Sequence, residues 1–124
     1  MKGIQHIGIP TNDLKKTVAF FESLGFEVVF EKYLENTNED VRFLRLGDVT
    51  VETYQNGKAS MRYGAVDHVC LNVTDIEAVY EKVTALGYPA LEDGIQFLPF
   101  WENGVRFFTI EGPDKEKVEF GQIL

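Results

Sequence analysis

The chain has 124 residues, 44% of them hydrophobic, and a formal net charge of −8 at pH 7. This length and composition suit one compact domain, or two halves that share a core, and exclude a disordered chain. The negative charge argues against nucleic acid and anionic membrane as partners, because both favour a basic surface. A single cysteine excludes an internal disulfide, and no apolar run is long enough to span a membrane. We expect a cytoplasmic protein without a signal peptide.

The predicted elements of the first half begin with an alternating strand over Gly3–Ile9. Pro10 and the capping residues Thr11-Asn12-Asp13 then predict a turn and a helix start, and Gly25 predicts the helix end. The apolar stripe of this helix is Leu14, Val18, Phe21 and Leu24. Three strands follow at Phe26–Tyr33, Val41–Leu46 and Val49–Gln55, with an acidic loop at Leu34–Asp40 and a tight turn at Gly47-Asp48.

The second half repeats this order at an offset of 62 residues. His6–Leu14 matches His68–Ile76 in pattern, and the helix stop Leu24-Gly25-Phe26 matches Leu86-Gly87-Tyr88. The predicted elements are a strand at Ala65–Val73, a helix at Asp75–Leu86, and strands near Tyr88–Glu92, Gly104–Ile110 and Lys117–Ile123. Internal repeats of this kind indicate that one structural unit occurs twice.

The repeat predicts an α+β protein built from two tandem βαβββ modules. We assign residues 1–55 and 65–124 to the modules and the polar, glycine-bounded segment 56–64 to a linker, within one domain spanning 1–124. A four-stranded sheet with one covering helix leaves its other face in need of a partner. We therefore expect the two sheets to combine around an open, barrel-like cleft.

Strand alternation places one histidine and one glutamate of each module on the face away from the helix. These residues are His6, Glu52, His68 and Glu119. A single histidine or glutamate in a strand is usually structural, but both residue types recur at matching places in the two modules. Four such groups gathered without a cation would suffer desolvation and carboxylate repulsion. The pattern therefore favours a shared divalent metal site.

This arrangement resembles the vicinal oxygen chelate superfamily, which includes glyoxalase I, methylmalonyl-CoA epimerase, fosfomycin-resistance proteins and extradiol dioxygenases. The resemblance covers essentially the whole chain, and it implies paired βαβββ modules with ligands on the first and last strand of each. The four implied ligands are His6, Glu52, His68 and Glu119, a set that is most similar to glyoxalase I, the lactoylglutathione lyase. One departure is the stretch Pro10-Thr11-Asn12, where bacterial glyoxalases often carry an arginine for glutathione.

The resemblance implies a metal-dependent lyase or isomerase that holds Ni²⁺, Co²⁺, Zn²⁺ or Mn²⁺. Two vicinal substrate oxygens would chelate the ion, and Glu119 or Glu52 would move a proton by way of an enediolate. The substrate would be the hemithioacetal of a 2-oxoaldehyde with a thiol, or a similar small carbonyl compound. The alternatives are an acyl-CoA epimerase, an epoxide thiol transferase, and a non-catalytic binder of the bleomycin-sequestering type.

Four further residues are candidates for substrate binding. The aromatic segment at Phe97–Gly104 suggests a lid or apolar rim, with Trp101 and Phe100 as its exposed members, although these side chains would equally well fill a core. Asn56 ends a stretch similar to the one that follows the first ligand glutamate of glyoxalase I, and Arg106 is a candidate for binding a carboxylate or thioester tail. The resemblance also favours a homodimer, in which the modules pair either within a chain or between two chains.

Overall fold

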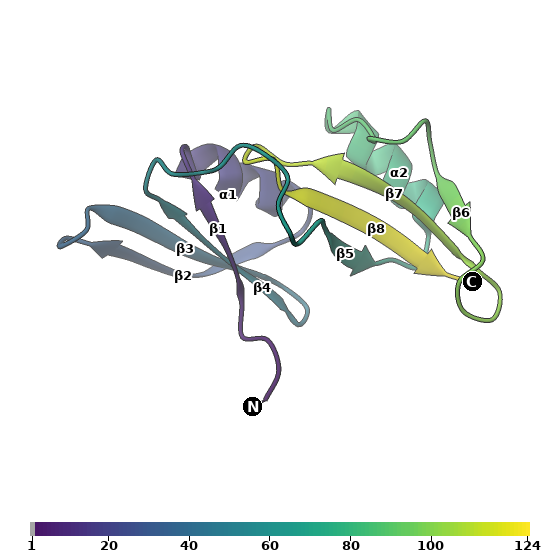
Figure 1. Cartoon of the computed structure of the whole chain (residues 1–124), viewed down its shortest axis with the longest axis horizontal. Helices are drawn as coiled ribbons and strands as arrows, with labels where there is room; N and C mark the ends of the chain where they lie inside the picture. Colours follow the sequence, from purple (N-terminus) through teal and green to yellow (C-terminus); the bar gives the residue numbers. More distant parts are fainter. Residues whose placement is uncertain (1) are drawn as a thin grey trace. The chain divides into compact units, whose positions relative to one another are not determined.

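The computed structural model describes residues 2–124 and divides the chain into two compact units, Met1–Arg62 and Tyr63–Leu124. Within the described residues each unit holds one four-stranded sheet and one helix, in the order β-α-β-β-β (Figure 1). The predicted α+β fold with two βαβββ modules is therefore confirmed, and both sheets are open. No helix within residues 2–124 is long and apolar enough to cross a membrane.

The first unit contains β1 (Ile7–Thr11), α1 (Leu14–Ser23), β2 (Glu27–Leu34), β3 (Glu39–Leu46) and β4 (Val49–Gln55). The strand order in the sheet is β1-β4-β3-β2, in which β1 runs parallel to β4 and the other pairs are antiparallel. The first strand of the unit therefore lies beside its last strand. This pairing brings the residues around His6 next to the strand that carries Glu52.

The second unit contains β5 (Val69–Asn72), α2 (Ile76–Ala85), β6 (Gln96–Leu98), β7 (Val105–Glu111) and β8 (Lys117–Ile123). Its strand order, β5-β8-β7-β6, has the same topology, and β5 again runs parallel to the last strand. The residues around His68 thus lie next to the strand that carries Glu119. The repeat in the sequence corresponds to a repeat in topology.

Both helices begin and end where the sequence predicts. The carboxylates of Asp13 and Asp75 accept hydrogen bonds from the amides of Lys16 (3.1 Å) and Ala78 (3.0 Å), which are N-cap interactions. Beyond the other end of each helix, Gly25 and Gly87 take φ values of 100° and 93°, a conformation that side chains with a Cβ rarely adopt.

A glutamine from the last strand of each unit fastens the first turn of the helix. The side-chain oxygens of Gln55 on β4 and Gln122 on β8 accept hydrogen bonds from the first helical amides, those of Leu14 (2.9 Å) and Ile76 (3.0 Å). Each glutamine lies three residues after the candidate ligand glutamate of its strand. The strand that presents the glutamate therefore also fixes the helix on the opposite face.

The buried face of α1 differs from the predicted stripe. Leu14 and Phe21 are buried as expected, but Val18 and Leu24 are only half-buried. Thr17 and Phe20 take the buried positions instead. The hydroxyl of Thr17 lies 2.9 Å from that of Thr11, so a hydrogen bond between two buried side chains replaces an apolar contact under the helix.

The first strand of each module is shorter than predicted. The predictions Gly3–Ile9 and Ala65–Val73 place both histidines inside strands, whereas β1 begins at Ile7 and β5 at Val69. Hydrogen-bonded pairing with the last strand begins at Ile7 opposite Val51 and at Val69 opposite Val118. The residues before them have no partner strand in the described residues. Pro10, predicted in a turn, belongs to β1 because an edge strand does not need its N–H for pairing.

The strand predicted near Tyr88–Glu92 is wrong, because β6 (Gln96–Leu98) occupies the edge position beside β7. The segment nevertheless contacts β7 at one point. The amide of Leu91 donates to the carbonyl of Thr109 (2.8 Å), and the amide of Thr109 donates to the carboxylate of Glu92 (2.8 Å). A side-chain carboxylate thus takes the place of a backbone carbonyl, which ends the ladder after one residue.

The turn between β7 and β8 makes stability depend on pH. One carboxylate oxygen of Glu116 accepts from the amide of Asp114 (2.8 Å), whereas the other is buried and has no hydrogen-bond partner in the described residues. Burial raises the pKa of Glu116 to about 7, and the Asp114 charge adds to the effect. The folded state therefore keeps a proton that the unfolded state loses near its ordinary pKa of 4.5. This contribution to stability is complete below pH 4.5 and is lost as the pH rises toward 7.

We expect Glu116→Gln to raise the free energy of unfolding above that of the wild type at pH 8 but not at pH 4. The rise in the pKa of Glu116 corresponds to at most about 3 kcal/mol of unfolding free energy. Because the side chain is partly exposed, we expect an effect of about 1–2 kcal/mol. Urea unfolding at both pH values measures the difference. Glu111→Gln is a matched control of opposite sign, because the hydrogen bond from Lys115 lowers the pKa of Glu111. An equal advantage for Glu116→Gln at both pH values would contradict the titration.

Candidate metal centre

The first unit brings His6 and Glu52 together at the pairing of β1 with β4. Val51 and Thr53 on β4 are buried, so alternation turns Glu52 toward the other face of the sheet. Nε2 of His6, just before β1, lies 3.1 Å from Oε2 of Glu52, and the two side chains are 31% and 26% exposed. The ring of Phe43 packs edge-on against the imidazole, with centroids 5.5 Å apart. Phe43 is the residue of β3 that pairs with Glu52, so the His6–Glu52 pair has an aromatic neighbour on the same sheet.

The second unit brings His68 and Glu119 together in the same way. Val118 and Phe120 on β8 are buried, and Glu119 between them faces the other side of the sheet. Nε2 of His68 lies 3.5 Å from Oε2 of Glu119, and the two side chains are 40% and 19% exposed. In both units the same ring nitrogen faces a carboxylate from the last strand. The predicted alternation on both last strands is therefore confirmed.

The other ring nitrogen of each histidine, Nδ1, contacts a side-chain oxygen of the preceding residue. The sequence analysis did not predict these two contacts. Nδ1 of His6 lies 2.9 Å from the side-chain oxygen of Gln5, and Nδ1 of His68 lies 2.9 Å from a carboxylate oxygen of Asp67. The hydrogen bonds from His68 and from Lys117 hold the pKa of Asp67 below its ordinary value. A signal was present in the sequence, because an oxygen-bearing side chain precedes the histidine in both repeats.

This donor geometry suits a cation. A neutral imidazole that donates from Nδ1 has only a lone pair on Nε2. In each unit that lone pair would point at a carboxylate oxygen, and two such donors repel each other unless a proton or a metal ion lies between them. Imidazole nitrogen and carboxylate oxygen are also the donors that Zn²⁺, Ni²⁺, Co²⁺ and Mn²⁺ accept. The residues present therefore fit a divalent metal.

A glycine lies beside each of the two glutamates. A Cβ at Gly8, which pairs with Glu52 across the parallel ladder, would lie 3.8 Å from Oε2 of that residue. A Cβ at Gly121 would lie 4.0 Å from Oε1 of Glu119 and only 2.9 Å from the sulfur of Cys70. A side chain at Gly121 would therefore displace the Cys70 sulfur, whereas one at Gly8 would make an ordinary contact with Glu52.

Cys70 is exposed and lies beside Glu119 in the β5–β8 pairing. Loss of water around the thiol, together with the Glu119 carboxylate, raises the pKa of Cys70 to about 12. The thiol therefore remains protonated at neutral pH, and this argues against a nucleophilic role.

Each unit alone supplies two donors, fewer than the three or four that a protein usually gives to such an ion. Within residues 2–124 no group of three or more His, Cys, Asp and Glu side chains is assembled as a metal site. The joint use of His6, Glu52, His68 and Glu119 at one ion thus stays a prediction. What the structure shows is one His–Glu pair of equal design in each unit.

Comparison with known protein families matches residues 3–120 to the family described as the Glyoxalase/Bleomycin resistance protein/Dioxygenase superfamily. The chain belongs to this superfamily. A curated relative, the uncharacterized protein YwbC of Bacillus subtilis (strain 168), is 32% identical over 128 residues and covers 98% of both chains. The superfamily contains enzymes and binding proteins, so membership alone does not decide between the two classes.

Solved structures of superfamily proteins share the fold of this chain. A glyoxalase family protein from Enterococcus faecalis superposes with a TM-score of 0.80 at 24% identity over 97% of each chain. The fosfomycin resistance protein FosX from Listeria monocytogenes, crystallised with Mn(II) and sulfate, gives a TM-score of 0.75 at 16% identity, covering 100% of this chain and 94% of that one. At these identities the likeness concerns the fold alone.

The predicted substrate residues of this superfamily member lie in different surroundings. Trp101 and Phe100 are 71% and 54% exposed in the loop between β6 and β7, which agrees with a rim and not with a core. The side-chain oxygen of Asn56 accepts from the amide of Lys58 (2.9 Å) just after β4. Arg106 forms an ion pair with Glu77 of α2.

Alternation along β7 places Arg106 on the face that α2 covers. Phe108, two residues further along, packs edge-on against Tyr80 of that helix. Thr109, directly opposite Glu119, therefore belongs to the other face. Arg106 therefore does not share a face with the His68–Glu119 pair, and its role in substrate binding stays a prediction.

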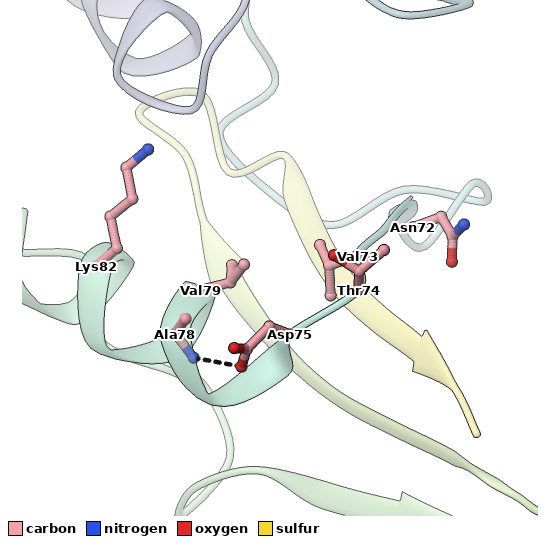
Figure 2. Close-up of a pocket in the computed structure, with 7 residues that line it drawn as sticks. All are labelled: Asn72, Val73, Thr74, Asp75, Ala78, Val79 and Lys82. Carbon is pink, nitrogen blue, oxygen red and sulfur yellow. Dashed lines mark hydrogen bonds between the residues drawn. The ribbon is translucent and has the colours of Figure 1, made fainter.

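Two surface hollows, one in each unit, lie away from the His–Glu pairs. Figure 2 shows a hollow of the second unit, at the start of α2, where the Asp75 carboxylate accepts a hydrogen bond from the amide of Ala78. Its other lining residues are Asn72, Val73, Thr74, Val79 and Lys82. A hollow in the first unit also adjoins its helix and is lined by Asp13, Leu14, Lys15, Val18, Ala19, Glu22, Asp40, Arg42 and Gln55. None of the predicted metal donors lines either hollow, so the chemistry of the donors and not the shape of these hollows identifies the candidate site.

Proposed function

We propose that this chain is a metal-dependent enzyme of glyoxalase type, a lyase or isomerase that moves a proton between adjacent carbons. Its substrate would be the hemithioacetal of a 2-oxoaldehyde with a thiol, or a similar small carbonyl compound. The observation that supports this proposal is the His–Glu pair of equal design in each unit, with Nε2 facing a carboxylate at 3.1 Å and 3.5 Å. His6, Glu52, His68 and Glu119 would together hold one Ni²⁺, Co²⁺, Zn²⁺ or Mn²⁺ ion.

The chain would divide the chemical work between a cation and its own carboxylates. The cation, when bound, supplies positive charge that stabilises negative charge on the substrate oxygens. Either Glu52 or Glu119 then takes the proton from one carbon and returns it to the neighbouring carbon. Both carboxylates are only partly exposed, so little bulk water competes for the proton.

Metal loading followed by a substrate panel tests this function. The purified protein should retain close to one equivalent of Ni²⁺, Co²⁺, Zn²⁺ or Mn²⁺ per site, and the loaded protein should convert the hemithioacetal of methylglyoxal with glutathione or another thiol. Proton exchange followed by NMR reports the transfer directly. Retention of less than about a tenth of an equivalent would favour a non-catalytic binder of the bleomycin-sequestering type.

Two conservative substitutions separate the roles of the glutamates. Glu52→Gln and Glu119→Gln each keep the shape of the side chain and one oxygen donor, but they remove the base. The variant of the proton-transferring residue should lose turnover by at least about 100-fold. A variant that keeps both its metal and full turnover removes that glutamate from the base role.

The second candidate function is the transfer of a thiol to an epoxide, whose ring opens as the carbon–sulfur bond forms. The fold shared with the fosfomycin resistance protein FosX favours this candidate. The crystals of that fosfomycin resistance protein contain Mn(II). An enzyme that opens an epoxide would use the same four metal donors, but its reaction would not include proton transfer between carbons. Fosfomycin and methylmalonyl-CoA therefore belong in the panel, and turnover of either in place of the hemithioacetals would replace the first proposal.

We also propose that the protein acts as a homodimer. Each unit contributes only two donors, so a complete site needs both units, either of one chain or of two chains. Sedimentation of the purified protein measures its mass in solution, and a monomer of 14.1 kDa that binds metal would require pairing within the chain.

A further inference from the structure

The partners of the two histidines define which ring nitrogen carries the proton. A carboxylate has no hydrogen to donate, so Nδ1 of His68 must be the donor in its 2.9 Å contact with Asp67. The contact of the same ring with Glu119, through Nε2, is longer at 3.5 Å. The shorter contact with a full carboxylate favours the Nδ1–H tautomer of the neutral ring.

Asp67 is itself held in place by the strand that carries Glu119. Its second oxygen lies 3.1 Å from Nζ of Lys117, at the start of β8. The Lys117 ammonium also lies 4.0 Å from the centre of the Tyr63 ring, and the Tyr63 hydroxyl bonds the carboxylate of Glu111. Charge and cation–π contacts thus fix the Asp67 carboxylate from the side opposite His68.

The corresponding position in the first unit carries a weaker partner. Gln5 is neutral, and no cation is recorded beside its oxygen in the described residues. On the other side of the ring, Nε2 of His6 lies only 3.1 Å from the Glu52 carboxylate, closer than in the second unit. A neutral His6 ring therefore has a charged acceptor at Nε2 and an uncharged one at Nδ1, the reverse of the preference at His68.

We propose that Asp67 is the positioning residue of His68, which it fixes as the Nδ1–H tautomer with the Nε2 lone pair facing Glu119 before any metal is bound. The second unit would then be the preformed half of the site, whereas His6 would adopt this tautomer only with the metal. A ligand histidine generally donates its other ring N–H to such a partner, which orients the ring. The inference rests on the proposed metal site but concerns a property of the metal-free protein.

The ring ¹⁵N shifts of the metal-free protein test this proposal. Recorded at about pH 8.5, these shifts distinguish the two neutral tautomers of each ring from one another and from the doubly protonated ring. His68 should be the Nδ1–H tautomer in the wild type and in Asp67→Asn, whose amide oxygen still accepts. In Asp67→Ala it should change to Nε2–H, with Glu119 as acceptor. Gln5→Ala is the matched control and should leave His68 unchanged.

A wild-type His68 in the Nε2–H form, or a tautomer unaffected by Asp67→Ala, would overturn the assignment. Mn²⁺ titration adds a second measurement. Asp67→Ala should weaken binding by about 10- to 100-fold, Asp67→Asn should recover most of the loss, and Gln5→Ala should cost less than Asp67→Ala. If the wild type binds no metal, the proposed function fails, but the tautomer measurement still decides the role of Asp67.

Discussion

His6→Ala and His68→Ala should each weaken Mn²⁺ or Co²⁺ binding by at least about 100-fold, beyond the 10- to 100-fold typical of losing a supporting residue. Each change removes one of two donors from its unit and leaves a carboxylate without its imidazole partner. Competition with a chelating dye measures the dissociation constant. Retained tight binding by either variant would show that its histidine is not a ligand.

Mixing the two variants tells whether one site is built from one chain or from two. If His6 of one chain meets His68 of another, a mixed dimer contains one intact site and one site that lacks both histidines. With random exchange half of the dimers are mixed, so about a quarter of the wild-type sites should return. If both units of one chain form the site, mixing restores none. Co-expression of the two variants avoids any dependence on slow exchange.

The sequence predicts the elements best where local chemistry determines them. Asp13 and Gly25 bound α1 because a cap and a left-handed stop are properties of those residues themselves. The buried hydroxyls of Thr11 and Thr17 escape a search for apolar periodicity, because their hydrogen bond joins residues that count as polar. The burial of a polar side chain that finds a hydrogen-bond partner can therefore be recognised only once the structure is known.

Strand ends and edge strands depend on partners far along the chain. The start of β5 at Val69 is set by the start of its pairing with β8, which lies almost fifty residues later. Similarly, the amide of Thr109 on β7 donates to the carboxylate of Glu92 and not to a backbone carbonyl of the segment Tyr88–Glu92. The strand that pairs with β7 is instead β6, further along the chain at Gln96–Leu98. Neither cause is visible in the local pattern of Ala65–Val73 or of Tyr88–Glu92.

The candidate donors were predictable because the repeat doubles the signal of each one. Alternation around Glu52 and Glu119 gave the correct face in both last strands. The supporting contact of Asp67 with His68 was not predicted, because adjacent residues in an extended segment usually point apart. Here His68 precedes the first paired residue of β5, where the chain is free to turn both side chains toward each other.

Phe108→Ala should lower the free energy of unfolding by about 3–5 kcal/mol. Phe108 is fully buried, and its ring stacks on that of Phe120 (centroids 4.9 Å apart) and meets Tyr80 of α2 edge-on (5.1 Å). Truncation would leave a cavity between the helix and the strand that holds Glu119, so the second unit should lose most of its stability. Urea unfolding followed by amide signals measures the loss residue by residue.

The matched control is Phe100→Ala, which removes the same ring from an exposed site and should change stability by no more than about 0.5 kcal/mol. The same titration tests whether the chain is one domain. If it is, amides of Met1–Arg62 should lose their signals at the same reduced urea concentration as those of Tyr63–Leu124. Unfolding of the second unit alone would show two independent folding units, and a small loss for Phe108→Ala would place the core of the second unit elsewhere.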